Sequence, residues 1–576
     1  MLALKCTGTE VWALKCTGTE VWALKCTGTE VWALKCTGTE VWALNRFKKM
    51  SNLTIFVVLF TFSASFFTCS TKNPHNSDEG ENSSKKDDIK NIQNYASNAV
   101  KDEEHLHELA LYAIEWAHNN GLVLLTEQTD IVEFAPISLF PSPFPKKSFE
   151  KALSVQKDMN LLYFRVASDH EFMVEAFKDL IRGDAHIAKL WQIVQEVREE
   201  GIRQPFTLLI QRADYMLNVV EDPKTGEEQY EIKQVEVNGG SIFGLGMKRR
   251  ISELHRQILR KVGLDVSASP VNQPDFALVE ALHMAWKQFG DSNALLMFLT
   301  PLLPYVFEQR HIASELERIS NGKIEVIFVS LVECAEILQL DPEDFSLRRK
   351  SDGRRVAVVY SNMSALGYRP RSDYDVQMEA RKMIERSNAI KAPSLALGIS
   401  CTKKIQQLLA KPENLKRFFP RPEDAETIEN IRSTFAGLWG LENDDQQTQD
   451  LIKDAMETPA NYVLKPNREC GGHNYFDEQI PEALQKFTRE ERGAHILMQK
   501  LRPMVVQNYV LRSLQEPKEA SVVPELGVYG FLLGNMMDGS VQHNVQQGYH
   551  FRSKLSHFNE CGVTAGFGFY DTAYLF

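Results

Sequence analysis

The folded part of this sequence contains few cysteines. Of the nine in the chain, four lie in copies of an N-terminal decapeptide and one, Cys69, lies in an apolar segment that follows; the remaining cysteines are Cys334, Cys401, Cys470 and Cys561. So low a density excludes a small scaffold held together by disulfides. The 14 histidines show no paired spacing with cysteines, so a zinc site is not expected.

Several common site motifs are also absent. No Walker A loop occurs, Gly244-Leu245-Gly246 lacks the third glycine of a dinucleotide-binding fingerprint, and residues 239–243 miss the nucleophile elbow of hydrolases by one position. Positive charge is in deficit, because 65 Lys and Arg face 76 Asp and Glu for a net charge of −11. An acidic chain of this kind disfavours nucleic acid as the main partner.

What is present is an ordinary globular composition over 576 residues, enough for roughly four folding units. Apolar periodicity predicts a helix over residues 106–117 and another over 172–200 that breaks near Gly183. Predicted strands occupy residues 207–211, 230–238, 294–299, 324–330, 356–360, 462–465 and 526–533. Mixed helices and strands of this size favour an α/β or α+β enzyme.

The N-terminus is repetitive. Residues 3–42 are four identical copies of ALKCTGTEVW, and a truncated fifth copy begins at Ala43. Ten residues supply at most one strand, whereas solenoid repeats are units of about 20–50 residues. We therefore interpret residues 1–49 as artefactual, from a duplication or a misassigned start, or as disordered.

A second candidate start lies at Met50. Basic residues precede it, an apolar run from 53 to 67 follows it, and small or polar residues come next. This pattern predicts a signal peptide over 50–70, a secreted protein and no stable membrane association after cleavage. An uncleaved anchor and a cytoplasmic protein are the alternatives. The polar segment 71–100 is predicted to be a disordered linker, with folding beginning near Lys101.

Two segments concentrate chemistry. In the predicted strand 234–238, alternation places Glu236 and Asn238 on one face and sends Val235 and Val237 into the core. A carboxylate and an amide oxygen at a strand end suit Mg²⁺, which also keeps phosphate oxygens in its shell. The alternative is a solvated strand face.

The second segment is residues 461–474. An apolar strand delivers Lys465 to a loop that carries Glu469 and two glycines. Lysine supplies a point charge to phosphates, glycines let backbone N–H groups approach them, and Glu469 can share a metal ion. A strand followed by a plain surface turn is the alternative.

In this order the two segments resemble eukaryotic glutathione synthetase, an ATP-grasp ligase family. The resemblance covers about residues 106–573, with further matching blocks at 135–141, 212–216, 402–407, 525–527 and 552–566. It implies an α/β (α+β) ATP-grasp fold of that type with an inserted substrate domain and lid loops. The implied parts are an N-terminal part over 101–289, a substrate-binding domain over 290–400 and a C-terminal part over 401–576.

The resemblance also implies an activity. The family joins γ-glutamylcysteine to glycine with ATP and Mg²⁺: the dipeptide carboxylate attacks the γ-phosphate, and the amine of glycine then displaces the acyl phosphate. Small-molecule substrates and a homodimer are implied with it.

Site residues follow from the matched positions, as the resemblance implies. Glu236, Asn238 and Glu469 would hold magnesium. Residues implied to bind ATP are Glu236, Lys403, Lys465, Asn474, Met498, Gln499, Lys500, Leu501, Glu525 and Lys554, with Met498 and Leu501 at the adenine. Substrate would contact Arg212, Gln309, Tyr368, Arg552, Val563 and Thr564. Arg552, Glu469 and Lys403 would be catalytic, and Arg552 would grip a carboxylate bidentately.

The acceptor side departs from the family pattern. Leu303 and Tyr305 stand where the family has a glutamate and an asparagine, the turn after Asn238 is one residue shorter, and the arginine expected before Gly367 is missing. Each charged hydrogen bond lost to a substrate costs about 1.5–3 kcal/mol. We therefore expect a diverged acceptor pocket, in a secreted form similar to the glutathione-synthetase-like effectors of plant-parasitic nematodes.

Two alternatives to this reading stay open. Neighbouring residues could compensate, which leaves a true glutathione synthetase; or the fold could serve as a non-catalytic protein that binds a metabolite or a host partner. Cys470 and Cys561 replace glycines of the two lid loops, and we hypothesise that they pair in an oxidising compartment and restrict lid motion.

Overall fold

The computed structural model describes residues 90–126, 131–240, 242–300, 306–362, 372–467, 473–563 and 565–576, together with the backbone of strands within residues 3–40. The chain divides into two compact units, Met1–Ser77 and Asp78–Phe576. The predicted signal peptide and most of the predicted linker lie outside the described residues.

The first unit holds five antiparallel strands from the decapeptide copies. They are β1 (Ala3–Cys6), β2 (Thr9–Cys16), β3 (Thr19–Cys26), β4 (Thr29–Cys36) and β5 (Thr39–Glu40), paired in chain order. Each of the three eight-residue strands β2, β3 and β4 joins the last four residues of one copy, TEVW, to the first four of the next, ALKC. The interpretation of residues 1–49 as artefactual or disordered stays a prediction.

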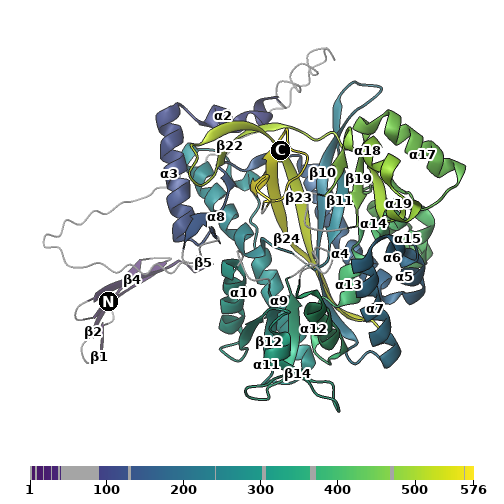
Figure 1. Ribbon diagram of the computed structural model, residues 1–576. Coiled ribbons are helices and arrows are strands. Elements are labelled where there is room, and N and C mark those ends of the chain that lie inside the picture. The colour runs from purple at the N-terminus through teal and green to yellow at the C-terminus, as the bar shows by residue number, and fades with distance from the viewer. Residues whose placement is uncertain are drawn as a thin grey trace. The chain divides into compact units, whose positions relative to one another are not determined.

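The second unit is organised around an 11-stranded mixed sheet (Figure 1). One end is parallel and consists of β13 (Val326–Val329), β12 (Leu295–Leu299), β16 (Val356–Ser361) and β17 (Ile390–Ala392). The rest is mostly antiparallel: β10 (Phe206–Glu221), β11 (Glu228–Asn238), β23 (Lys518–Asn535), β22 (Val506–Leu511), β24 (Val541–Leu555), β8 (Ile137–Ser138) and β25 (Gly568–Tyr570).

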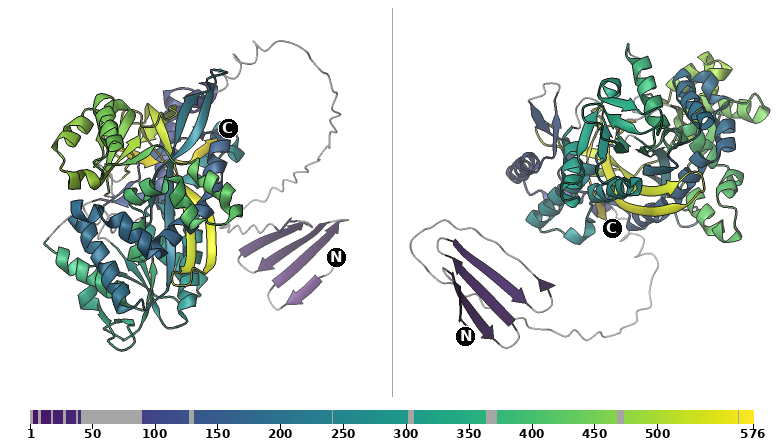
Figure 2. Two further views of the ribbon diagram at one scale, coloured as in Figure 1. Left: turned by 90° about the vertical axis from the view of Figure 1, so that its right-hand side faces the viewer. Right: turned by 90° about the horizontal axis from the view of Figure 1, so that it is seen from below.

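A second, four-stranded sheet carries part of the site. Its order is β18 (Leu438–Gly440), β21 (His495–Gln499), β19 (Tyr462–Pro466) and β20 (Tyr475–Phe476). With helices α17 (Gln446–Glu457) and α18 (Gln479–Lys486) it forms the light green lobe of Figures 1 and 2. Two-stranded pairs are β6 (Val123–Leu125) with β7 (Val132–Phe134), β9 (Ser142–Phe144) with β26 (Ala573–Leu575), and β14 (Leu338–Leu340) with β15 (Leu347–Arg349).

Helices cover the large sheet. α4 (Lys146–Ser168) packs on β10, β11, β23 and β24, and α9 (Pro274–Phe289) packs on β10, β16, β17, β23 and β24. The other helices of five or more residues are α2 (Tyr95–Ala99), α3 (Glu103–Asn119), α5 (His170–Phe177), α7 (Ala185–Glu200), α8 (Leu245–Val262), α10 (Val306–Ile319), α12 (Tyr374–Arg386), α13 (Leu395–Ser400), α14 (Lys403–Leu409), α15 (Pro412–Phe418), α16 (Ala425–Arg432) and α19 (Arg489–Gly493). Two shorter ones are α6 (Leu180–Gly183) and α11 (Cys334–Ile337).

The mixed fold class is confirmed, and so are the main predicted elements. The helix predicted over 106–117 is α3, and Gly121 follows it with φ 70°. The predicted stretch 172–200 is α5, α6 and α7, interrupted beside Gly183. Each predicted strand lies on one observed strand, but β23 begins at Lys518, eight residues before the predicted start, because its first half lacks a continuous apolar run.

Folded structure also begins earlier than Lys101. Tyr95 on α2 is buried, its ring stacks on Tyr574 at 4.5 Å, and its hydroxyl donates to the carbonyl of Pro141. One aromatic anchor on a polar segment therefore holds this segment against the core.

Among the residues that the structure describes, no helix combines the length and the apolar character needed to cross a bilayer.

Candidate active site

The largest group of predicted site residues lines one cavity of about 420 Å³. Strands β10, β11, β23 and β24 of the large sheet supply one side, and β19 and β21 of the four-stranded sheet supply another. The predicted residues that line it are Arg212, Glu236, Asn238, Lys403, Lys465, Asn474, Met498, Gln499, Lys500, Leu501, Glu525, Arg552, Lys554 and Val563. Segments up to 350 positions apart in the chain thus meet at one place.

Four predicted residues are not brought to this cavity by the described structure. Gln309 is buried on α10 and does not line the cavity. Glu469, Tyr368 and Thr564 lie outside the described residues. The same holds for the divergent positions Leu303 and Tyr305.

A β-bulge shapes the strand that carries the two predicted metal ligands. Asp214 on β10 pairs with Glu236, but Tyr215 pairs with Gln234, so Val235 is the extra residue. The prediction that Val235 enters the core is wrong: Val235 is half-buried and lines the cavity, whereas Val237 is buried. A bulge breaks the two-residue alternation and leaves a carbonyl unpaired in the ladder. Lys465 Nζ donates to this carbonyl of Val235 at 3.1 Å.

Lysines surround Glu236. Lys403, at the start of α14, places its Nζ 3.6 Å from Glu236 Oε2. Lys403 and Lys465 are both largely buried. Burial by itself would raise the pKa of Glu236, but Lys403 and Lys465 outweigh it and lower the pKa to about 2. Burial, together with the neighbouring Lys403, lowers the pKa of Lys465 to about 8. At neutral pH this end of the cavity therefore holds a fixed carboxylate among cationic amines.

Two arginines and two acids form a buried network beside it. Arg212 donates Nε and Nη2 to the two oxygens of Asp214, at 2.6 and 2.7 Å. Arg552 donates Nε to Glu525 Oε1 at 2.7 Å and reaches Asp214 Oδ2 with Nη2 at 3.4 Å. The Nε/Nη2 edge of Arg552 is thus already in use. To hold a substrate carboxylate bidentately with this edge, Arg552 has to exchange Glu525 for it.

Part of the cavity wall is apolar. Met498 on β21 is buried, and Leu501 follows two residues after this strand ends. The side chains between them turn to protein partners: Gln499 accepts the N–H of Gly437 at 3.1 Å, and Lys500 pairs with Asp477 at 2.7 Å. Met498 and Leu501 therefore form an apolar wall of the kind that a flat heteroaromatic ring occupies.

Comparison with known proteins identifies the family to which this cavity and fold belong. The model of the eukaryotic glutathione synthase ATP-binding domain matches residues 103–575. The chain belongs to the eukaryotic glutathione synthetase family. Mouse glutathione synthetase is 33% identical over 484 residues, which cover 82% of this chain and 98% of the mouse protein. The Dictyostelium discoideum glutathione synthetase is 33% identical over 493 residues, 82% of this chain and 100% of that protein.

A solved structure gives the same answer. It is a glutathione synthetase-like effector from Globodera pallida in apo form, with a TM-score of 0.67 and 34% identity over 83% of this chain and 99% of that one. The ATP-grasp fold of the eukaryotic glutathione synthetase type is therefore confirmed, and membership makes this protein a ligase of that family.

Two segments of the glutathione synthetase fold meet at the cavity. Asn474 Nδ2 donates to Glu560 Oε1 at 3.1 Å, which joins the segment after Lys465 to the loop after β24. Lys554 Nζ donates to the carbonyl of Asn559 at 2.6 Å within this second loop. The amine of Lys554 is therefore held by loop backbone, whereas that of Lys465 is held by the Val235 carbonyl of β11.

Cys561 lies in the second of these loops. Its thiol is unpaired and buried, and burial raises its pKa to about 12, so it is a poor nucleophile. Cys470 lies outside the described residues. Their disulfide stays a hypothesis.

Three charged or polar groups in or near the cavity were not predicted from the sequence. Asp214 holds both arginines, and its spacing of two from Arg212 on one strand is a signal that was present in the sequence. Glu308, on α10, is fully buried and accepts the N–H of Gly244 with both oxygens, at 2.9 and 2.8 Å. Burial raises the pKa of Glu308 to about 7.

The third missed group is His550, which lines the cavity beside the arginines. Its Nδ1 lies 3.0 Å from the hydroxyl of Tyr529, and its Nε2 is buried with no hydrogen-bond partner among the described residues. Burial, with Lys248 and both arginines nearby, holds its pKa well below 6.5. The ring is therefore neutral at neutral pH.

The donor set fits the magnesium ion that the family uses. Asn238 Nδ2 donates to Asp214 at 3.1 Å, which leaves the amide oxygen for a metal, and the Glu236 carboxylate lines the same cavity two residues away. Hard oxygen donors are what Mg²⁺ takes. The described residues do not by themselves bring three Asp, Glu, His or Cys side chains to one point, so the remaining ligands would come from phosphates, water and Glu469.

Proposed function

We propose that this protein is an ATP- and Mg²⁺-dependent ligase that joins the carboxylate of a γ-glutamyl peptide to a small amine, with an acceptor pocket that differs from the family's. One observation carries the proposal. The buried amines of Lys403 and Lys465, the Glu236 carboxylate and the apolar wall of Met498 and Leu501 line one cavity. Phosphates and a purine need these surfaces together.

In this proposal the lysines bind and orient the nucleotide. Lys403 and Lys465 neutralise phosphate oxygens as charge develops on them, and their positions are fixed by Glu236 and by the Val235 carbonyl. Such preorganised cations are the main source of rate in phosphoryl transfer. Glu236, Asn238 and Glu469 would hold Mg²⁺. When bound, the ion would neutralise further charge on the phosphates.

The reaction has two steps. A peptide carboxylate oxygen attacks the γ-phosphorus, and the bond from this phosphorus to the bridging oxygen breaks to release ADP. The amine nitrogen then attacks the acyl carbon, phosphate leaves, and the amine proton passes to solvent or phosphate. Arg212 and Arg552 lie where they can orient the peptide, and the Asp214 and Glu525 carboxylates keep both guanidinium groups in place.

The acceptor and the cellular location belong to the same proposal. Leu303 and Tyr305 stand where the resemblance places groups that hold the γ-glutamyl end, and the turn after Asn238 is shorter. These differences support an acceptor pocket that differs from the family's. The apolar run after Met50 supports secretion, and the similarity to an effector from Globodera pallida is consistent with an effector role. We also propose a homodimer, which light scattering of the purified protein at several concentrations tests.

The test is ADP release from purified protein with ATP, Mg²⁺, γ-glutamylcysteine and a panel of amines that includes glycine. The proposal expects release that requires both peptide and amine and that is greater with an amine other than glycine. If glycine is the one amine of the panel that supports ADP release with the peptide, the protein is a true glutathione synthetase. Measurable ATP binding without turnover on the whole panel would show a binding protein and would refute the ligase.

A further inference from the structure

The residues that face the proposed nucleotide come from segments far apart in the chain. Lys403 begins α14, Lys465 lies on β19 and Met498 lies on β21, and all three line the large cavity. A misplacement of about 1 Å in a site of this kind costs on the order of 100-fold in rate. The groups that align these three segments therefore matter to the function.

Asn467 bonds all three segments together. It lies two residues after Lys465 and is 2% exposed. Its Oδ1 accepts the main-chain N–H of Lys404, the neighbour of Lys403, at 2.7 Å. Its Nδ2 donates to the carbonyl of Ala494, the residue before β21, at 2.9 Å, and its main-chain N–H donates to the same carbonyl at 3.3 Å. One buried amide thus connects α14, β19 and β21.

The side chain of Asn467 acts on a ligand only through its neighbours. Both ends of its amide are bonded to main chain, and Asn467 is not among the described residues that line the cavity. An amide offers a donor and an acceptor on one planar group. This is what a bridge between an N–H and a carbonyl needs.

The bridge holds like charges together. Lys403 and Lys465 are both largely buried, and both act on the carboxylate of Glu236. Two cations repel each other more strongly in a buried site than in water. A restraint in the main chain therefore keeps the two amines at one place.

Helix α14 is also bonded to both sheets. Lys404 Nζ lies 2.6 Å from Oε1 of Glu442, which follows β18 of the four-stranded sheet. Gln406 Nε2 donates to Oε1 of Gln234, on β11 of the large sheet, at 3.0 Å. The helix that carries Lys403 is thus fixed between the two sheets that form the cavity.

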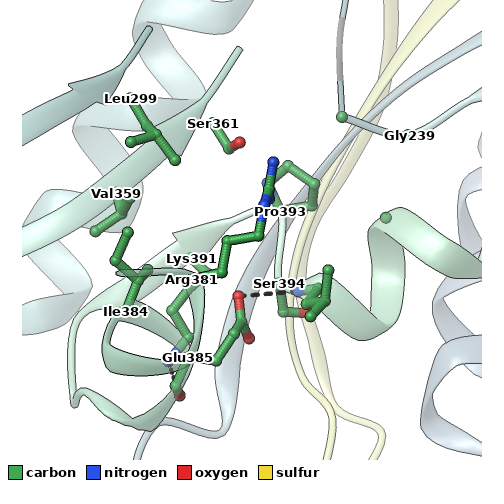
Figure 3. A pocket seen from close by; sticks show the side chains of 13 residues that line it. Gly239, Leu299, Val359, Ser361, Arg381, Ile384, Glu385, Lys391, Pro393 and Ser394 are labelled. Carbon is green, nitrogen blue, oxygen red and sulfur yellow. Dashed lines mark hydrogen bonds between the residues drawn. The ribbon is translucent and has the colours of Figure 1, made fainter. Parts of the chain in front are cut away.

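The turn after Asn238 packs on the start of the same helix. Gly239 follows Asn238 and also lines a small separate cavity (Figure 3). A Cβ added to Gly239 would lie 2.4 Å from Sγ of Cys401, which lies two residues before Lys403. Only glycine lets main chain come so near. The segment that Asn467 holds therefore also packs against the turn of a predicted metal ligand.

We propose that Asn467 is a positioning residue for nucleotide binding: its amide sets where the amines of Lys403 and Lys465 lie relative to each other and to the wall at Met498. The three hydrogen bonds that Asn467 makes support this role. The inference rests on the proposed function for the identity of the ligand as ATP.

The test compares two buried asparagines. Asn467→Leu removes both side-chain hydrogen bonds at similar volume. Asn508→Leu is the matched control, because the Asn508 amide donates to the Phe140 carbonyl at 2.8 Å and accepts the Phe140 N–H at 3.3 Å. Neither Asn508 nor Phe140 lines the cavity. Both variants should lower the urea midpoint of unfolding, because each leaves buried main-chain groups without a partner.

Nucleotide affinity separates positioning from stability. Calorimetry with Mg²⁺ measures the Kd of a non-hydrolysable ATP analogue. N467L should raise this Kd about 10-fold or more, the size typical of groups that orient ligand-binding side chains, and N508L should leave it unchanged. The Kd of γ-glutamylcysteine should stay unchanged in both variants.

A second measurement uses the free protein. NMR of the lysine ε-carbons follows the titration of Lys465, whose signal is assigned by its loss in Lys465→Met. The pKa of Lys465 is about 8 in the wild type, because of burial and the neighbouring Lys403. It should rise toward 10.5 in N467L, because the amine leaves its buried place beside Lys403, and it should not rise in N508L.

An unchanged nucleotide Kd and an unchanged Lys465 pKa in folded N467L would overturn the inference. Equal changes in N467L and N508L would overturn it too. Where N467L does not fold, Asn467→Ala decides by the same two measurements, because water can reach the main-chain groups that this smaller side chain frees.

The NMR arm needs no nucleotide. A raised Lys465 pKa in N467L, in a protein that binds no ATP analogue, would refute only the proposed function. ADP release by the wild type, with a nucleotide Kd and a Lys465 pKa that ignore Asn467, would refute only this inference.

Discussion

Arg552 and Glu525 are register partners on the antiparallel strands β24 and β23, and the Arg552 Nε–H donates to Glu525 Oε1 at 2.7 Å. Both side chains are largely buried and Asp214 is the second acid within reach of Arg552. The pair therefore fixes a guanidinium in the wall of the cavity before any ligand arrives.

Glu525→Gln should destabilise the protein by about 1–3 kcal/mol, because it removes the charge that compensates a buried arginine. Urea unfolding followed by circular dichroism measures this change. The matched control is Glu457→Gln, which removes an exposed partner of Lys453 at 3.8 Å and should change stability by less than about 0.5 kcal/mol. Equal effects of the two variants would contradict the role assigned to the buried pair.

Lys465→Met should raise the Kd of an ATP analogue about 10–100-fold, because the variant loses a charged hydrogen bond to phosphate. Calorimetry with Mg²⁺ present measures it. Lys453→Met serves as control, since Lys453 is an exposed residue on α17. Unchanged nucleotide affinity in K465M would remove Lys465 from the phosphate site.

Nucleotide affinity should also depend on pH. Burial lowers the pKa of Lys465 to about 8 in the free protein, so above this pH the amine is neutral and must take up a proton when phosphates bind. The Kd should therefore rise as pH increases from 7.5 to 9.5, by at most tenfold per unit. In K465M the part of the slope that belongs to this lysine should vanish, and an identical slope in both proteins would count against the assignment.

Glu308 gives a pH dependence of stability. Its pKa is raised from 4.5 to about 7 in the folded state, so between these values the folded protein keeps a proton that the unfolded chain has lost. Its contribution is full below pH 4.5 and falls as pH rises to 7, by up to about 3 kcal/mol. Urea unfolding at pH 5 and 7 should show that Glu308→Gln is relatively more stable at pH 7. The same difference between wild type and E308Q at both pH values would contradict this titration.

The sequence carried the strand that holds Glu236 and Asn238, because alternation alone puts residues two apart on one face. The same alternation wrongly predicted that Val235 enters the core. The bulge depends on how β11 pairs with β10, and local periodicity does not encode this pairing. The bulge is what gives Lys465 its backbone acceptor.

The roles of Glu308, His550 and Asn467 could not be predicted for a related reason. Each is an ordinary polar residue in its own segment, and only tertiary packing buries it. Asn467 directly follows β19, where an asparagine is ordinary for a turn. Its bonds to Lys404 and Ala494 are a property of the assembled site.

The most direct test of the central claim is a crystal structure with Mg²⁺ and a non-hydrolysable ATP analogue. The account predicts phosphates between Lys403 and Lys465, the metal at Glu236 and Asn238, and the adenine against Met498 and Leu501. An analogue bound elsewhere, or an empty cavity at millimolar nucleotide, would contradict it.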